Sequence, residues 1–198
     1  MKYRPPAERD QIALDLLTKL DAAYVLLLNV PNIVGPAYGA RMCDYAAKPR
    51  RAFERLIIEA HDILSDDAWR NAGGWDWHTG EFLNPHGARN RLRERVGEAP
   101  FPEDDPRIRS SFRYGERYPV LALSEHGQLG ADLKAVHATL NTAICTTGNT
   151  WGKTHDLCHR ARKAQRVLLT LRSHLDSVVH KDHPGDRASL YFGGEAGQ

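Results

Sequence analysis

The stretch "KTHDLCHRARKAQRVLLTLRSHLDSVVH", residues Lys153–His180, carries the most regular apolar pattern in the chain. Its apolar residues recur at alternating steps of four and three, and they are Leu157, Ala161, Ala164, Leu168, Leu171, Leu175 and Val178. This spacing places them on one narrow stripe of a helix, as in the seam of an antiparallel helical bundle. The pattern therefore predicts a helix over about 153–180, with a stripe that other helices must cover.

Three further segments have a helical period and supply that cover. They span about 7–30, 36–65 and 131–146. Pro31 ends the first pattern, Pro49 is expected to open the main part of the second, and Gly148 follows the third. The sequence therefore predicts a mainly α fold with a four-helix bundle-like core built from both ends of the chain.

The insertion at about 66–130, between the second and third helices, has a different composition. It contains "WRNAGGWDWHTGEF", whose Trp75 and Trp77 are expected to pack onto the helices rather than line a ligand pocket. The stretch "SSFRYGERYPVLALSE" suggests a small β-hairpin around Gly115. We interpret the last residues, "LYFGGEAGQ", as a loose tail. At 198 residues the chain is expected to form a single domain.

Composition narrows the class of protein. Hydrophobic residues make up 41% and charged residues 26%, the balance of a soluble globular protein. The longest apolar run, "AAYVLLLNV", is too short to cross a bilayer, so we expect no membrane partner. The start, "MKYRPPAERDQ", lacks the apolar core of a secretory signal, which favours a cytoplasmic location. Three cysteines without a CxxC pair argue against a disulfide framework.

The tripeptide Gly152-Lys153-Thr154 resembles the end of a phosphate-binding loop. Such a loop has a glycine five residues before the second glycine, where this chain has Thr147, and it follows a strand rather than a helix. We therefore interpret this stretch as a turn between two helices, with Thr150 or Thr154 capping the second.

His155 and His159 stand four residues apart, so a helix would place both on one face, as in many zinc sites. Cys158 lies beside them, but Asp156 occupies the position where a zinc protease has glutamate. The pattern supplies only two of the ligands that a zinc site needs, so zinc stays a hypothesis, and no other cofactor is expected.

Basic residues form two candidate binding surfaces. The segment "KPRRAFER" contains Lys48, Arg50, Arg51 and Arg55, and the outer stripe of the last helix contains Arg162 and Arg166. Such stripes bind nucleic acid phosphates or an acidic protein partner. The chain has 20 arginines against 7 lysines but a net charge of only +2. A solvated face and an arginine-rich coding background are therefore the competing interpretation.

Arg55 and His61, in "RLIIEAH", form the candidate catalytic pair. Their spacing is that of the arginine–histidine motif in HEPN-type ribonucleases, which are helical, but Leu56 stands where that motif favours a polar residue. We do not assign the family on this pair.

The sequence favours a non-enzymatic binding or regulatory protein that acts through basic helix faces on nucleic acid or on a protein partner. The alternative is a histidine-dependent enzyme, either a HEPN-like ribonuclease or a metal-dependent hydrolase. The regular seam at 153–180 also allows self-association as a homo-oligomer.

Overall fold

The computed structural model describes residues 6–63, 85–100, 120–185 and 190–192. The helices in these ranges are α1 (Pro6–Leu28), α2 (Val30–Tyr38), α3 (Ala40–Asp62), α5 (Pro85–Arg95), α6 (Leu123–Thr150) and α7 (Asp156–Asp182). These ranges contain no strand, and the predicted mainly α class is confirmed. The aromatic stretch around Trp75 and the hairpin tip at Gly115 lie outside the described residues.

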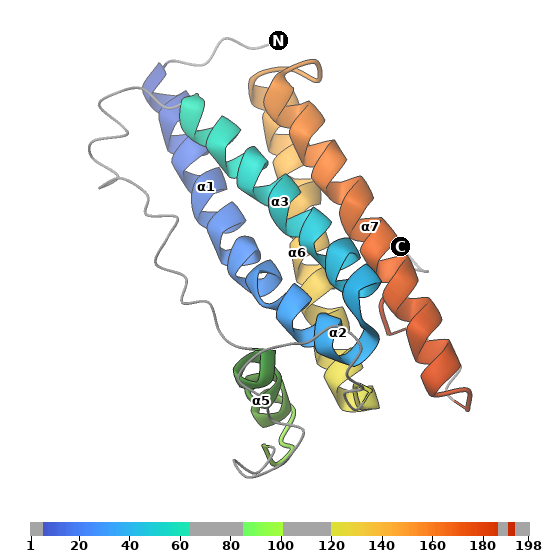
Figure 1. The fold of residues 1–198 in the computed structure, drawn as a ribbon. Helices are drawn as coiled ribbons and strands as arrows, with labels where there is room; N and C mark the ends of the chain where they lie inside the picture. The colour runs from blue at the N-terminus through green and yellow to red at the C-terminus, as the bar shows by residue number, and fades with distance from the viewer. Residues whose placement is uncertain (1–5, 64–84, 101–119, 186–189, 193–198) are drawn as a thin grey trace.

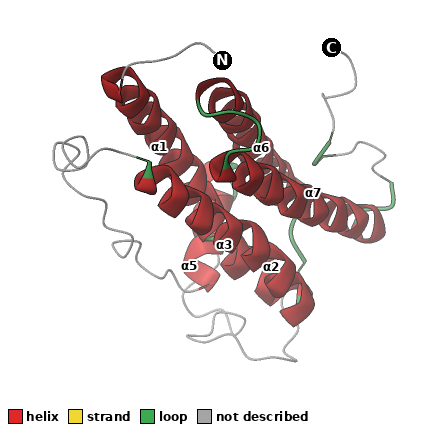
Figure 2. Ribbon diagram, turned by 90° about the horizontal axis from the view of Figure 1, so that it is seen from above, coloured by secondary structure: helices red, strands yellow, loops and turns green. Residues whose placement is uncertain are grey.

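The long helices α1, α3, α6 and α7 run side by side (Figure 1). Helix α7 packs against α3 and α6, and both of these also pack against α1. Seen from above, α3 and α6 lie between α1 and α7 (Figure 2). Helices α2 and α5 lie together at one end of this assembly, where α5 contacts both α2 and α6.

The predicted seam of α7 forms one side of the core. Its first six apolar residues, from Leu157 to Leu175, are fully buried. The last step differs, because Val178 is only half-buried and Val179 is buried in its place. Opposing residues from the other helices include Leu20, Leu27, Phe53, Ile57, Leu133 and Leu140. Burying each large apolar side chain contributes about 1.5–3 kcal/mol, so this seam is a main source of stability.

The second predicted helix, 36–65, is divided in the structure. Gly39 has φ +84° and separates α2 from α3. Because side chains strongly disfavour this backbone conformation, a glycine allows the chain to turn here. Pro49 is expected from the sequence to open the main part of this helix, and that expectation is wrong, because Pro49 lies buried inside α3. The first helix correspondingly ends at Leu28, two residues before its predicted boundary.

The third predicted helix, 131–146, is longer in the structure, where α6 begins at Leu123 and ends at Thr150. Residues 123–130 therefore belong to a helix and not to an insertion that is partly β. The Glu125 carboxylate accepts a hydrogen bond from the Ala122 N–H at 2.6 Å and so caps the helix start. Gly130 lies inside this helix. A glycine is needed there because a Cβ would stand 2.5 Å from the Leu190 carbonyl oxygen.

The turn between α6 and α7 accounts for the incomplete phosphate loop. Gly152 has φ +105°, and its N–H donates to the Thr147 carbonyl at 3.2 Å. The residue that caps α7 is His155, whose Nδ1 accepts from the Leu157 N–H at 3.2 Å, and not a threonine as predicted. The stretch is a helix corner that follows a helix and not a strand.

In the part of the chain that the structure describes, no helix combines the length and apolarity needed to span a membrane.

Candidate functional site

A groove of about 210 Å³ lies between α3 and α7. It is lined by Lys48, Arg51, Ala52, Arg55, Arg160, Lys163 and Val167. Five of these residues are basic and none is acidic. We call this site the basic groove.

Helical periodicity explains why these residues meet. On α3 the basic positions 48, 51 and 55 follow one another at steps of three and four, so they form one stripe. On α7 the lining positions 160, 163 and 167 follow the same rule. The apolar seams of the two helices pack together, and these stripes flank that contact on the solvent side. The groove is therefore a consequence of core packing and of basic residues next to each seam.

Positive charge in the basic groove is only partly compensated. All five basic side chains are exposed. Arg160 donates from Nε to Glu59 Oε2 at 2.7 Å. In the described part of the chain, Lys48, Arg51, Arg55 and Lys163 form no ion pair with a carboxylate. Like charges concentrated in a groove raise the local positive potential and attract anions.

The structure brings together some of the predicted binding residues and separates others. Lys48 and Arg51 line the basic groove. Arg50 instead forms an ion pair on its own helix, with its Nε 3.5 Å from Glu54 Oε1. Arg162 and Arg166 are exposed on α7 but do not line the groove. The partners that α7 does contribute, Arg160 and Lys163, are not among the residues that the sequence singles out.

The candidate catalytic residues Arg55 and His61 do not face the same way. Six residues on a helix correspond to about 600°, so their side chains point about 120° apart. Arg55 lines the basic groove, whereas His61 is half-buried in the last turn of α3. Burial lowers the pKa of His61, and nearby Asp62 opposes that shift.

The candidate metal residues His155 and His159 lie at the start of α7. His155 caps the helix with its Nδ1, and His159 is exposed one turn later. Cys158 is buried and turned toward α6, where its Sγ lies 4.0 Å from the Ile144 carbonyl oxygen. Among the described residues, no three histidine, cysteine, aspartate or glutamate side chains are placed to share a metal ion.

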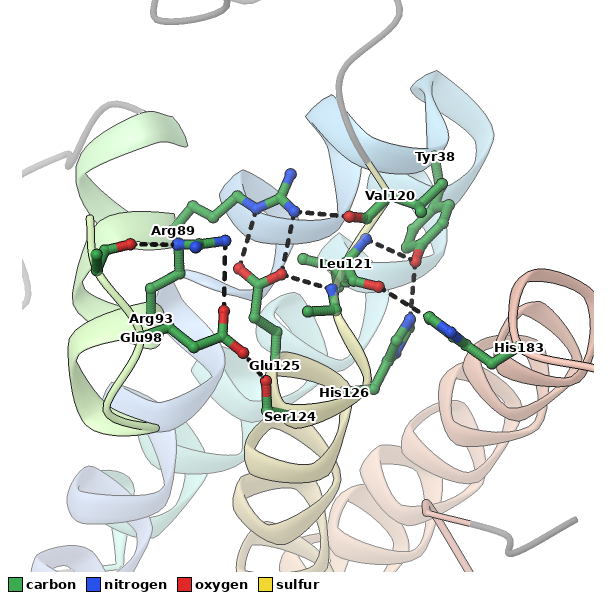
Figure 3. A network of polar contacts seen from close by, with 12 residues as sticks. Tyr38, Arg89, Arg93, Glu98, Val120, Leu121, Ser124, Glu125, His126 and His183 are labelled. Atoms are coloured by element: carbon green, nitrogen blue, oxygen red, sulfur yellow. Dashed lines mark hydrogen bonds and ion pairs between the residues drawn. The ribbon is translucent and has the colours of Figure 1, made fainter. Parts of the chain in front are cut away.

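A second polar cluster lies buried where α2 and α6 meet the C-terminal segment, and Figure 3 shows part of it. His126 is fully buried, with Nε2 2.8 Å from the Tyr38 hydroxyl and Nδ1 2.7 Å from the Tyr191 hydroxyl. The Tyr38 oxygen also accepts from the Leu121 N–H at 3.2 Å. His183 Nε2 lies 3.1 Å from the Leu121 carbonyl oxygen. The ring of His126 is thus held by two distant parts of the chain, α2 and the C-terminal segment.

The electrostatics of this cluster favour neutral side chains. Burial, with smaller contributions from His183 and Arg89, lowers the pKa of His126 to about 4. Burial raises the pKa values of Tyr38 and Tyr191. A neutral imidazole has one donor and one acceptor nitrogen, which suits two hydroxyl partners. Because His126 has no exposed surface, its ring is suited to holding helices together rather than to contacting a substrate.

Arg89 of α5 extends the polar network (Figure 3). Its guanidinium donates twice to Glu125, from Nε and from Nη2, both at 3.1 Å, and from Nη2 to the Val120 carbonyl at 2.8 Å. Both side chains are buried. The pair attaches α5 to the start of α6, close to the Tyr38–His126 contact.

Sequence reasoning misses the buried cluster entirely. Tyr38, His126 and Tyr191 are separated by 65 residues or more, and no spacing rule connects them. The expected tail is also wrong at Leu190–Phe192, since Tyr191 is fully buried and its carbonyl accepts from Arg172 Nε at 2.8 Å. The one available signal is the aromatic pair Tyr191–Phe192 in an otherwise polar segment.

Comparison with known proteins provides no relative: no family model matches the chain, and neither a curated protein nor a solved structure matches it significantly.

Proposed function

We propose that this protein binds nucleic acid without chemical turnover, with backbone phosphates in the basic groove between α3 and α7. The observation that carries the proposal is the lining of that groove: five basic side chains and no carboxylate. Phosphate contacts from lysine and arginine dominate nucleic acid affinity, and arginine adds paired donors that match phosphate oxygens. The half-buried Ala52 and Val167 give the floor of the groove a partly apolar character.

In this proposal α1, α3, α6 and α7 form a four-helix bundle that holds the two basic stripes at a fixed separation. Both stripes lie on long helices whose apolar seams are mostly buried. A ligand therefore finds the cations already arranged, and binding has a smaller entropic cost than it would on a loop.

The experiment compares two double variants that remove the same charge. One is Arg51→Ala/Lys163→Ala, in the basic groove; the other is Arg162→Ala/Arg166→Ala, on the outer stripe of α7. Binding of a fluorescein-labelled single-stranded RNA of about 16 nucleotides is followed by anisotropy at low salt. All four side chains are exposed, so both variants are expected to fold like the wild type.

We expect the groove variant to lose about tenfold or more in affinity and the outer variant to lose much less, because only the first removes phosphate contacts. Equal losses would show that net charge and not the groove determines binding. If the wild type binds no RNA but binds a helical peptide rich in glutamate, the proposal is wrong and the partner is an acidic protein.

A further inference from the structure

A second groove continues along the same two helices, from the basic groove toward α2. Its volume is about 450 Å³, within the range of about 300–1,000 Å³ that is usual for ligand sites. Its lining combines apolar or aromatic side chains from α2, α3 and α7 with polar ones: Tyr38, Met42, Tyr45, His174 and Val178, and Arg41, Ser177, Lys181 and Asp182. We call this site the ring pocket.

Two rings of the pocket already lie against each other, so a ligand meets their remaining faces and edges. The ring centroids of Tyr45 and His174 lie 3.9 Å apart at a tilt of 32°. Tyr38 adds a third ring, whose hydroxyl is occupied by His126 and by the Leu121 N–H. Figure 3 shows this hydroxyl directed toward His126. Tyr38 therefore contributes ring surface rather than a polar group to the pocket.

The two grooves share a boundary and differ in charge. Lys48 lines the basic groove, and its ammonium lies 4.7 Å from the Tyr45 ring centroid. Asp182 lines the ring pocket together with Arg41 and Lys181, whereas no carboxylate lines the basic groove. An anionic group is therefore favoured at the Lys48 end. At the other end Asp182 supplies an acceptor while Arg41 and Lys181 supply donors, which suits a flat group whose edge carries both donors and acceptors.

The distances suit one continuous ligand. Along α3, Tyr45 precedes Arg51 by six residues, or about 9 Å, and Arg55 by ten residues, or about 15 Å. A strand that follows the helix could place phosphates on these arginines and a base against Tyr45. A single small anion would occupy only part of this length.

We propose that the ring pocket binds an unpaired base, and that the protein recognises single-stranded RNA or DNA. This inference rests on the proposed phosphate binding in the basic groove. Bases of a duplex are paired and stacked inside the helix, whereas those of a single strand can turn outward and stack on aromatic side chains. Every base has a flat face, so the pocket is expected to show little sequence preference.

The test uses three labelled probes with the same number of phosphates per strand. They are a mixed-sequence single-stranded RNA, an abasic phosphodiester strand and a duplex, each of about 16 nucleotides per strand. We expect the wild type to bind the RNA about 5- to 150-fold more tightly than the abasic strand, since stacking contributes that factor per base. The duplex is expected to bind like the abasic strand.

Two variants of the ring pocket separate stacking from folding. Tyr45→Leu retains apolar bulk but removes the ring, and Tyr45→Phe retains the ring. We expect Tyr45→Leu to bind the RNA no better than the abasic strand, whereas Tyr45→Phe behaves like the wild type. Circular dichroism checks that both variants keep the helical fold.

The outcomes distinguish this inference from the proposal on which it rests. If the wild type binds RNA, abasic strand and duplex equally, and Tyr45→Leu has no effect, phosphate binding stands and base recognition is wrong. If none of the three probes binds even at low salt, both proposals are wrong. If the duplex binds most tightly, the basic groove reads the backbone of a double helix and the ring pocket takes no base.

Discussion

Two buried residues show how closely the helices at the α2 end fit together. His126 connects hydroxyls from α2 and from the C-terminal segment, and its ring has no contact with solvent. Gly130, one turn further along α6, leaves room for the backbone of Leu190. A charge at the first position or a methyl group at the second would each disturb this junction.

The protein is expected to lose stability in acid because His126 becomes protonated. The pKa is near 6.5 in the unfolded chain and about 4 in the folded protein. Between these values the unfolded state binds a proton that the folded state does not, so the free energy of unfolding falls as pH falls from about 6.5 to about 4. The full loss is about 3 kcal/mol. Urea denaturation across this pH range measures it.

The matched variant is His126→Gln, which keeps polar groups at this position but does not titrate. It is expected to be less sensitive to pH between 6.5 and 4 than the wild type. The pKa of His61 is also lowered by burial, so His61 contributes to the acid dependence in the same direction. The variant His61→Gln measures that contribution separately. If His126→Gln keeps the whole acid dependence, the neutral buried state assigned to His126 is wrong.

Gly130→Ala is expected to destabilise the protein, whereas Gly127→Ala is expected to stabilise it. A Cβ at Gly130 would stand 2.5 Å from the Leu190 oxygen, and relieving such overpacking costs about 1–3 kcal/mol. A Cβ at Gly127 meets no atom within 4 Å, so alanine there contributes about 0.5–1 kcal/mol through helix propensity. Thermal denaturation of the two variants measures both signs, and a stabilised Gly130→Ala would contradict the close packing.

At the scale of elements, two ion pairs between the described residues of α5 and α6 differ in burial. Arg89–Glu125 is buried, whereas Arg95–Asp132 involves an arginine side chain with 49% of its surface exposed. Each pair has two hydrogen bonds of 3.0–3.1 Å. Their geometry is therefore similar, and solvent access is the main difference.

Arg89→Ala is expected to cost about 3–5 kcal/mol, because it leaves the Glu125 carboxylate buried without its main partner. Arg95→Ala is expected to cost at most about 1 kcal/mol, because water replaces an exposed pair at little cost. Urea denaturation followed by circular dichroism compares the two variants. Equal costs would show that burial does not determine the strength of these pairs.

The helices differ in how well the sequence predicts them. The seam of α7 is correct at six of its seven positions because its periodicity is a local property. Two of the errors occur at glycines: Gly39 separates two helices inside a predicted one, and Gly130 lies inside α6 although the sequence pattern places it in the insertion. In the sequence, a glycine that turns the chain looks the same as a glycine that makes room for another segment. The two can be told apart only when the position of that segment in the fold is known.

At the scale of the whole molecule, the distribution of charge indicates a site for anions that the net charge does not reveal. The net charge is only +2, yet the basic groove concentrates five cations where α3 meets α7. Sequence patterns predict Lys48 and Arg51 as binding residues but place the other surface on the outer stripe of α7. Which flank of α7 lies beside α3 depends on how four helices pack together, and periodicity within one helix does not contain that information.

The most direct test of the account is the salt dependence of binding to single-stranded RNA. If all five cations of the basic groove contact phosphates, the logarithm of affinity should fall with the logarithm of salt concentration with a slope of about −3.5. For Arg51→Ala/Lys163→Ala the slope should be about −2, because two contacts are lost. A wild-type slope near zero, or the same slope in this variant, would contradict phosphate binding in the groove.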